Sequence, residues 1–147
     1  MANPYMQQAL QQARLAMEND DVPVGAVVVF GKRIISSGYN LREVKQSATA
    51  HAEIVAIEEA CRALGTWYLT DCDLYVTLEP CIMCAGAIIN ARIRSLYFGA
   101  FDQKAGACGS VTDVFRLPLN HPVTVYGGIM EDACSALLKE FFQQKRK

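Results

Sequence analysis

The sequence predicts an α/β fold, a single domain in which helices cover both faces of a mixed β-sheet. Its 147 residues, 52% of them hydrophobic, are enough for one substantial core and too few for two ordinary domains. Helical and extended patterns alternate in the order αββαβαββα, which is typical of a sheet with helices packed on it. No internal repeat, long linker or low-complexity tract interrupts this order, so we expect one domain over residues 1–147.

The first half of the chain predicts a helix, a β-hairpin and a second helix. Apolar residues recur at three- and four-residue spacing among glutamines from 5 to 18, the pattern of an amphipathic helix. Residues 25–30 and 33–39 are apolar and β-branched runs joined by a Gly-Lys dipeptide, and glycine at the first central position suits a two-residue hairpin turn. Residues 52–64 carry an apolar stripe with an exposed acidic pair and end at a glycine, which predicts another amphipathic helix.

The second half continues the alternation of strands and helices. We expect strands at 74–78, 95–98 and 123–126, helices at 81–91 and 132–144, a Gly-rich loop at 99–110 and a short helical piece at 111–115. The pairing of strands beyond the first hairpin is not set by these patterns.

Charge and hydropathy exclude several classes of protein. The formal net charge is -1 and the pI is about 6.1, so binding to nucleic acid through a broad positive surface is not expected and any such contact must be local. The longest apolar stretches, 22–30 and 82–89, are far shorter than the roughly 20 residues that span a bilayer. The N-terminus lacks the basic and apolar regions of a secretory signal. We therefore expect a cytoplasmic protein without a membrane span.

Two short segments supply the residues of a catalytic metal site. Cys81 and Cys84 are three residues apart at a helix start, where both sulfurs point to one side and the helix dipole favours thiolates. With His51 they make three zinc ligands, which leaves one coordination position for a water molecule. Glu53 follows two residues after His51 and is placed better as a non-ligand beside that water, as general acid and base. The only other histidine is His121, so the count favours a catalytic site over a closed structural one.

Other interpretations of the cysteines are weaker. A single Cys-x-x-Cys also occurs in redox motifs and in half of a zinc finger, but no second copy completes a finger, and a redox motif leaves the His-x-Glu segment unexplained. The remaining cysteines have apolar or mixed surroundings and are interpreted as small buried hydrophobic residues; they are Cys61, Cys72, Cys108 and Cys134.

His-x-Glu followed by Pro-Cys-x-x-Cys resembles the signature of zinc-dependent nucleobase deaminases. Over nearly the whole chain the sequence is similar to the bacterial tRNA-specific adenosine deaminases. The matching stretches are VPVGAVVV, TAHAEIVA, LYVTLEPCIMCAGAII, FGA with Asp102 and Lys104, Gly109-Ser110, Asn120-His121 and CSALLKEFFQQKRK. Three positions depart from the family pattern: Phe101 stands where a basic residue is common, Ala105 where threonine is frequent, and Ala48 where proline often precedes the His-x-Glu segment.

The resemblance implies both fold and function. It implies the cytidine deaminase-like three-layer α/β/α sandwich with a five-stranded mixed sheet, a homodimer, and one Zn²⁺ per subunit. The implied reaction is the hydrolytic deamination of adenosine to inosine at wobble position 34 of a tRNA anticodon, with release of ammonia. It further implies that Asn40, Asp102 and Lys104 bind the substrate. An RNA-facing wall from the last helix is implied as well, made by Phe141, Phe142 and Arg146.

Two other functions remain open at this point. The same metal ligands serve deaminases of a free base or nucleoside, such as guanine, cytosine or cytidine. The loop at 99–110 and the basic terminal helix favour RNA over these substrates. An inactive, zinc-stabilised RNA-binding module is the third interpretation, and the presence of Glu53 speaks against it.

Overall fold

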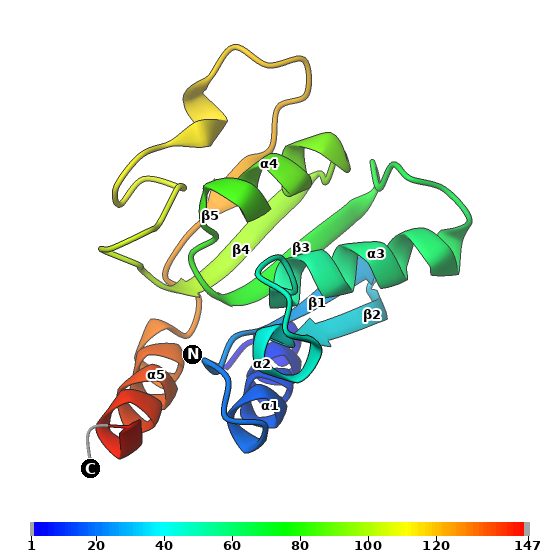
Figure 1. The fold of residues 1–147 in the computed structure, drawn as a ribbon. Coiled ribbons are helices and arrows are strands. Elements are labelled where there is room, and N and C mark those ends of the chain that lie inside the picture. Colours follow the sequence, from blue (N-terminus) through cyan, green and yellow to red (C-terminus); the bar gives the residue numbers. More distant parts are fainter. Residues whose placement is uncertain (1, 146–147) are drawn as a thin grey trace.

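The computed structural model describes residues 2–145, which form a five-stranded mixed sheet between two layers of helices (Figure 1). The strand order is β2-β1-β3-β4-β5. The strands are β1 (Gly25–Phe30), β2 (Arg33–Tyr39), β3 (Cys72–Leu78), β4 (Ser95–Ala100) and β5 (Thr124–Tyr126). β1 pairs antiparallel with both β2 and β3, whereas β3, β4 and β5 run parallel. The predicted three-layer α/β/α sandwich is confirmed.

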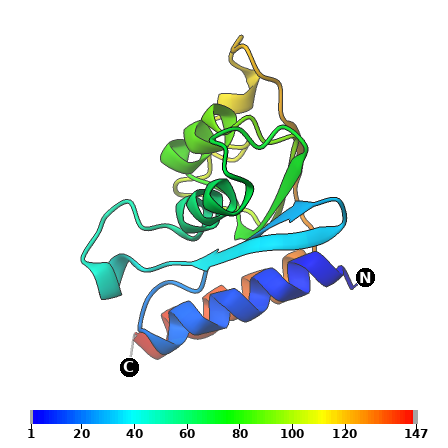
Figure 2. The same cartoon turned by 90° about the vertical axis from the view of Figure 1, so that its right-hand side faces the viewer.

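Two helices pack on each face of the sheet. The helices are α1 (Pro4–Glu18), α2 (Arg42–Lys45), α3 (Ala52–Leu64), α4 (Ile82–Asn90) and α5 (Glu131–Lys145), with a 3₁₀ turn η1 (Val114–Arg116). Figure 2 shows α1 and α5 side by side beneath the sheet and α3 and α4 above it. α3 follows β2 and α4 follows β3, so both helices of the upper layer start at the same end of the sheet (Figure 1).

The core consists of two apolar clusters, one on each side of the sheet. Strand β1 divides its side chains between them, because successive residues of a strand point to opposite faces. Ala26 and Val28 pack with the residues of α3 and α4, while Val27 and Val29 pack with those of α1 and α5. Because β1 is buried on both faces from Gly25 to Val29, its sequence is apolar without the alternation of a half-exposed strand.

Glycines allow the helices to approach the hairpin closely. A Cβ atom on Gly38 would lie 2.7 Å from the carbonyl oxygen of Ala52 and 2.8 Å from the amide nitrogen of Ala56, both in α3. A Cβ on Gly25 would collide with the backbone of α1 on the other face. In the turn itself both Gly31 (φ 57°) and Lys32 (φ 65°) are left-handed, the conformation of a type I′ turn.

The structure corrects several predicted boundaries. β3 begins at Cys72 and not at 74, and the helical piece expected at 111–115 is the turn η1 at 114–116. β4 continues to Ala100, so the loop predicted at 99–110 begins two residues later. Small residues were interpreted there as loop, but Gly99 is small because Cys134 of α5 packs directly against it. The four-residue helix α2 carried no periodic signal and was not predicted. Within residues 2–145 no helix has the length and apolar character to cross a membrane.

Candidate active site

The N-termini of α3 and α4 bring three potential metal ligands together. His51 is the residue before α3, Cys81 is the residue before α4, and Cys84 lies buried in the first turn of α4. The Nδ1 atom of His51 is 3.8 Å from the sulfur of Cys81 and 3.5 Å from that of Cys84. The three ligand atoms all lie within 4.8 Å of one another, so this group can hold a metal ion.

The three ligand groups shift one another's pKa values through hydrogen bonds. Hydrogen bonds from Cys84 and His51 lower the pKa of the Cys81 thiol to about 3. The hydrogen bond to Cys81 raises the pKa of Cys84, with burial as the second cause. The pKa of His51 is raised, chiefly by its hydrogen bond to Cys81. A metal ion would bind both thiolates and the neutral imidazole, since these are the forms that coordinate it.

Glu53 lies beside the ligand group without belonging to it. Its position in the first turn of α3 leaves the residue only 4% exposed. Burial raises the pKa of its carboxyl to about 7, and the attraction of His51 opposes that rise. A carboxyl with such a pKa can both accept and give up a proton near neutral pH, which general acid and base catalysis requires.

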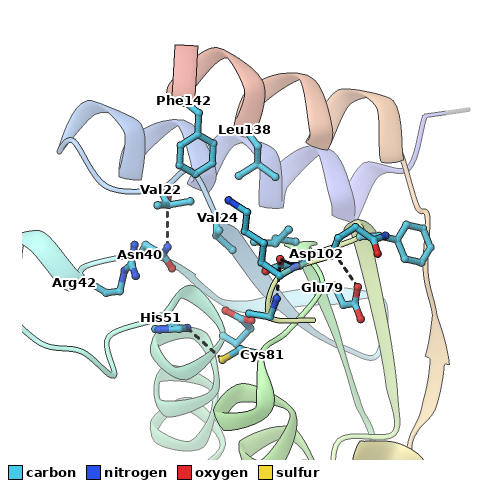
Figure 3. A pocket seen from close by; sticks show the side chains of 16 residues that line it. Val22, Val24, Asn40, Arg42, His51, Glu79, Cys81, Asp102, Leu138 and Phe142 are labelled. Atoms are coloured by element: carbon cyan, nitrogen blue, oxygen red, sulfur yellow. Dashed lines mark hydrogen bonds between the residues drawn. The ribbon is translucent and has the colours of Figure 1, made fainter. Parts of the chain in front are cut away.

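His51, Cys81 and Glu53 line a pocket of about 540 Å³, and Cys84 is buried behind them. Figure 3 shows His51 and Cys81 at one end of this pocket and Leu138 and Phe142 of α5 at the other. The pocket lining combines apolar with polar and charged side chains. Its other members are Val22, Val24, Asn40, Arg42, Glu53, Leu78, Glu79, Phe101, Asp102, Gln103, Lys104 and Ala105. The size and lining are those of a site for a small organic group such as a nucleobase.

The three residues predicted to bind substrate all line this pocket. Asn40 is 5% exposed, donates to the carbonyl of Val22 at 3.1 Å and accepts from the amide of Ala52 at 2.9 Å. It therefore fixes the first residue of α3, between His51 and Glu53. One carboxylate oxygen of Asp102 accepts hydrogen bonds from the backbone amides of Lys104 and Ala105. The Lys104 side chain is exposed at the rim.

Two buried acidic residues near the pocket were not singled out from the sequence. Asp21, 1% exposed, binds the guanidinium of Arg42 at 3.2 Å and accepts from the amide of Glu43 at 3.0 Å. It thereby holds Arg42 at the pocket wall. Glu79, 2% exposed, accepts from the amide of Asp102. An acidic residue next to an apolar run was the available signal, but exposed carboxylates share that pattern.

The remaining predicted positions divide between core, pocket and other surfaces. Phe141 is buried, whereas Phe142 lines the pocket, so of the two phenylalanines implied for an RNA-facing wall only Phe142 is placed at the pocket. Arg146 lies outside the described residues. Phe101, the departure from the family pattern, packs edge to face on Phe98 with ring centroids 5.1 Å apart. His121 is not among the pocket residues, and its ring nitrogen faces the carbonyl of Ile93.

Known proteins resemble the chain over nearly its full length. The family described as MafB19-like deaminase matches residues 2–146. The tRNA-specific adenosine deaminase of Bacillus subtilis (strain 168) is 46% identical over 144 residues, covering 97% of this chain and 89% of that protein. A solved structure from work on A-to-I editing by tRNA:A34 deaminases at the wobble position has a TM-score of 0.89 and 47% identity, covering 91% of this chain and 98% of the other. A guanine deaminase from Nitrosomonas europaea has a TM-score of 0.78 and 32% identity, covering 96% and 85%.

Proposed function

Because this chain belongs to the tRNA-specific adenosine deaminases, within the MafB19-like deaminases, we propose that it deaminates adenosine at wobble position 34 of a tRNA anticodon. The reaction consumes water, leaves inosine in the RNA and releases ammonia. The single observation that carries the proposal is the pocket that unites the His51, Cys81 and Cys84 group, the buried Glu53, and cationic and aromatic side chains at its rim. A metal group alone is common to all zinc deaminases, whereas such a rim suits a nucleotide within RNA.

The ligand group fits zinc. Zn–N and Zn–S bonds of about 2.1 and 2.3 Å in a tetrahedral site set the nitrogen and sulfur ligands roughly 3.6 Å apart. The corresponding distances from His51 to the two cysteines are 3.5 and 3.8 Å. Two thiolates and one imidazole are also a donor set that zinc prefers, and we propose one Zn²⁺ per subunit held by His51, Cys81 and Cys84. Bound there, zinc lowers the pKa of a water molecule so that hydroxide forms near neutral pH.

Glu53 moves the protons of the reaction. Its carboxylate accepts a proton from the attacking water and passes it to the ring nitrogen of adenine, next to the carbon under attack. The same carboxyl then takes the proton of the hydroxyl group now attached to the ring carbon and gives it to the amino group, so that the C–N bond breaks, the ring C=O of inosine forms and ammonia leaves. The burial of Glu53 serves this role because a carboxyl whose pKa lies about 7 is not committed to either protonation state.

The other pocket residues bind the nucleotide. Asn40 is anchored by Val22 and Ala52 through one N–H and through its carbonyl oxygen, and none of residues 2–145 accepts its second N–H. That N–H is available for the nucleoside. Lys104 and Arg42 lie at the pocket wall, where cations contact backbone phosphates. Phe142 offers an aromatic face on which an unpaired base of the anticodon loop can stack.

We also propose that the protein is a homodimer that acts in the cytoplasm as one deaminase domain. The outward face of α4 supports the dimer, because it carries no charged residue and Ile82 at its start is 69% exposed. Leu117 and Leu119, which follow η1, are exposed as well, and η1 packs against α4. Several exposed apolar side chains in one region of a surface mark a protein contact. The measurement is the mass of the protein in sedimentation equilibrium, where a monomer at micromolar concentration contradicts the proposal.

A deaminase of a free base is the second candidate, favoured by the likeness to a solved guanine deaminase. The two are separated by incubating the protein with an anticodon stem-loop that carries adenosine at position 34 and, in parallel, with guanine, cytidine and adenosine. We expect ammonia from the stem-loop. Ammonia only from a free base contradicts the proposed function, and zinc-dependent RNA binding without turnover on any substrate indicates a non-catalytic module.

A further inference from the structure

The carboxylate of Glu79 is buried at the junction between the sheet and the metal group. Glu79 follows the last residue of β3 and precedes Pro80 and Cys81. It is 2% exposed, although no cation is paired with it in residues 2–145. Burial of a carboxylate away from water costs free energy unless hydrogen bonds compensate for the lost hydration. The hydrogen-bond partners of Glu79 therefore show which part of the structure it stabilises.

All hydrogen-bond partners of the Glu79 side chain lie in one segment, residues 101–110, which we name the pocket loop. Its Oε1 atom accepts from the amide of Asp102 at 3.0 Å and from the hydroxyl of Ser110. Its Oε2 atom accepts from the amides of Cys108 and Ser110 at 3.0 and 3.1 Å. Figure 3 shows the contact between Glu79 and Asp102 beside the pocket. Both ends of the loop are thus tied to a single carboxylate.

Internal hydrogen bonds carry this anchoring to the residues at the pocket rim. The Asp102 carboxylate holds the amides of Lys104 and Ala105, and the Asp102 carbonyl accepts from the amide of Gly106 at 2.9 Å. The amide of Ala107 donates to the carbonyl of Pro80, also at 2.9 Å. The backbone that carries Lys104 is therefore fixed through Asp102, whose own amide is held by Glu79.

We propose that Glu79 is a positioning residue: its carboxylate holds the pocket loop in one conformation before substrate arrives, so that the loop presents a preformed wall to the RNA. The part of this inference that concerns RNA rests on the proposed function. Preorganisation of this kind lowers the ordering cost that binding would otherwise include. The role is one of positioning because Glu79 acts through the loop, while proton transfer belongs to Glu53.

Glu79→Gln tests the proposal with little change in volume. An amide side chain keeps one acceptor oxygen but turns the other position into a donor, which then faces backbone N–H groups. Amide hydrogen exchange on the metal-loaded protein without RNA measures directly how firmly the pocket loop is held. We expect the amides of Asp102, Cys108 and Ser110 to exchange on the order of tenfold faster or more, and those of β1 and β3 to keep their rates. Zinc content, measured in the same samples, is expected to stay equimolar.

Two further variants make the exchange experiment specific. Ser110→Ala removes only the hydroxyl contact and keeps the three amide contacts, so it should accelerate exchange less than Glu79→Gln does. Gly106→Ala acts from the other side, since its Cβ would collide with the Glu79 carboxyl and would lie 2.5 Å from the Asp102 carbonyl oxygen. Gly106→Ala, in which the carboxylate itself is retained, should therefore accelerate the exchange of the same loop amides, because the added methyl group forces the loop and the Glu79 side chain apart.

Kinetics with the adenosine-34 stem-loop test the consequence for substrate. For Glu79→Gln we expect KM to rise by about tenfold and kcat to fall by a smaller factor, since the loss is mainly of preformed binding surface. A purely structural role would instead reduce the active fraction, and thus kcat, at unchanged KM.

Unchanged exchange of the three amides in Glu79→Gln overturns the proposal, and so does equal acceleration throughout the sheet. A loosened loop with unchanged KM overturns its role toward RNA. If the wild-type protein does not act on the stem-loop at all, the proposed function fails, whereas the exchange result still decides whether Glu79 holds the loop.

Discussion

Gly38→Ala tests how closely the metal group depends on the packing of α3 against β2. The added methyl carbon would lie 2.7 Å from the Ala52 carbonyl oxygen, 2.8 Å from the Ala56 amide nitrogen and 2.9 Å from the Val55 Cβ. Ordinary contact begins at 3.4 Å, so the helix must move by about 0.7 Å to bring the first of these distances to that value. Two of the three neighbours are backbone atoms, which no side-chain rotation can move aside.

The displaced helix carries Glu53 and begins directly after His51, while Cys81 and Cys84 lie at the start of α4. We therefore expect Gly38→Ala to lower the free energy of unfolding by about 1–3 kcal/mol, the usual cost of overpacking. We also expect kcat/KM to fall on the order of 10- to 100-fold, since shifts near 1 Å in reacting groups have such effects. The measurements are urea denaturation, zinc affinity by competition with a chelator, and steady-state kinetics on the stem-loop.

Gly25→Ala is the matched control, because the same methyl on the opposite face of the hairpin pushes against α1. It should destabilise the protein at least as much while changing the zinc affinity less. If Gly38→Ala leaves zinc affinity and kcat/KM at wild-type values, or if the two variants lose zinc affinity equally, the link between this helix contact and the site is refuted.

The remaining predictions concern the metal, the RNA contact and the dimer. Cys84→Ala removes a buried ligand, so we expect the protein to bind less zinc and to be less stable. The measurements are a lower melting temperature and a zinc content below one ion per subunit. Full metal occupancy would contradict this prediction. Lys104→Ala should weaken stem-loop binding most at low salt, because a phosphate contact is lost. The slope of log Kd against log salt should fall by about 0.7, the value for one phosphate contact in a single strand. An unchanged slope would exclude that contact. Ile82→Glu should shift sedimentation toward the monomer, since it places a charge on the apolar face of α4; an intact dimer would place the interface elsewhere.

Local patterns in the sequence predicted most of the fold. The hairpin strands were predicted at 25–30 and 33–39, and the helix at 52–64, with the bounds that the structure has. Two of these segments are followed by a glycine in the left-handed conformation, Gly31 with a φ of 57° after the first strand and Gly65 with a φ of 69° after the helix. The strand order β2-β1-β3-β4-β5 depends on contacts between distant segments and was not predicted; the family resemblance implied a five-stranded mixed sheet without its order.

In the candidate site too, the residues within short motifs were predicted, and those whose partners are distant in the sequence were not. His51, Glu53, Cys81 and Cys84 were recognised because short motifs carry them, and the structure brings the three ligand atoms together. Glu79 and Asp21 were missed because their roles arise only when the chain folds back on itself. Nothing in the spacing of Glu79 to Asp102 or Ser110, 23 and 31 residues along the chain, indicates that they meet.

In the proposed function, Glu53 and the adjacent metal group convert adenosine to inosine within an anticodon loop. The most direct measurement is sequence-resolved nucleoside analysis of an adenosine-34 stem-loop after incubation with the zinc-loaded protein and with its Glu53→Gln variant. We predict inosine at position 34 with the wild-type protein, and neither inosine nor ammonia with Glu53→Gln at full zinc content. Inosine formation at an undiminished rate by Glu53→Gln, or an unchanged adenosine with the wild-type protein, would contradict the account.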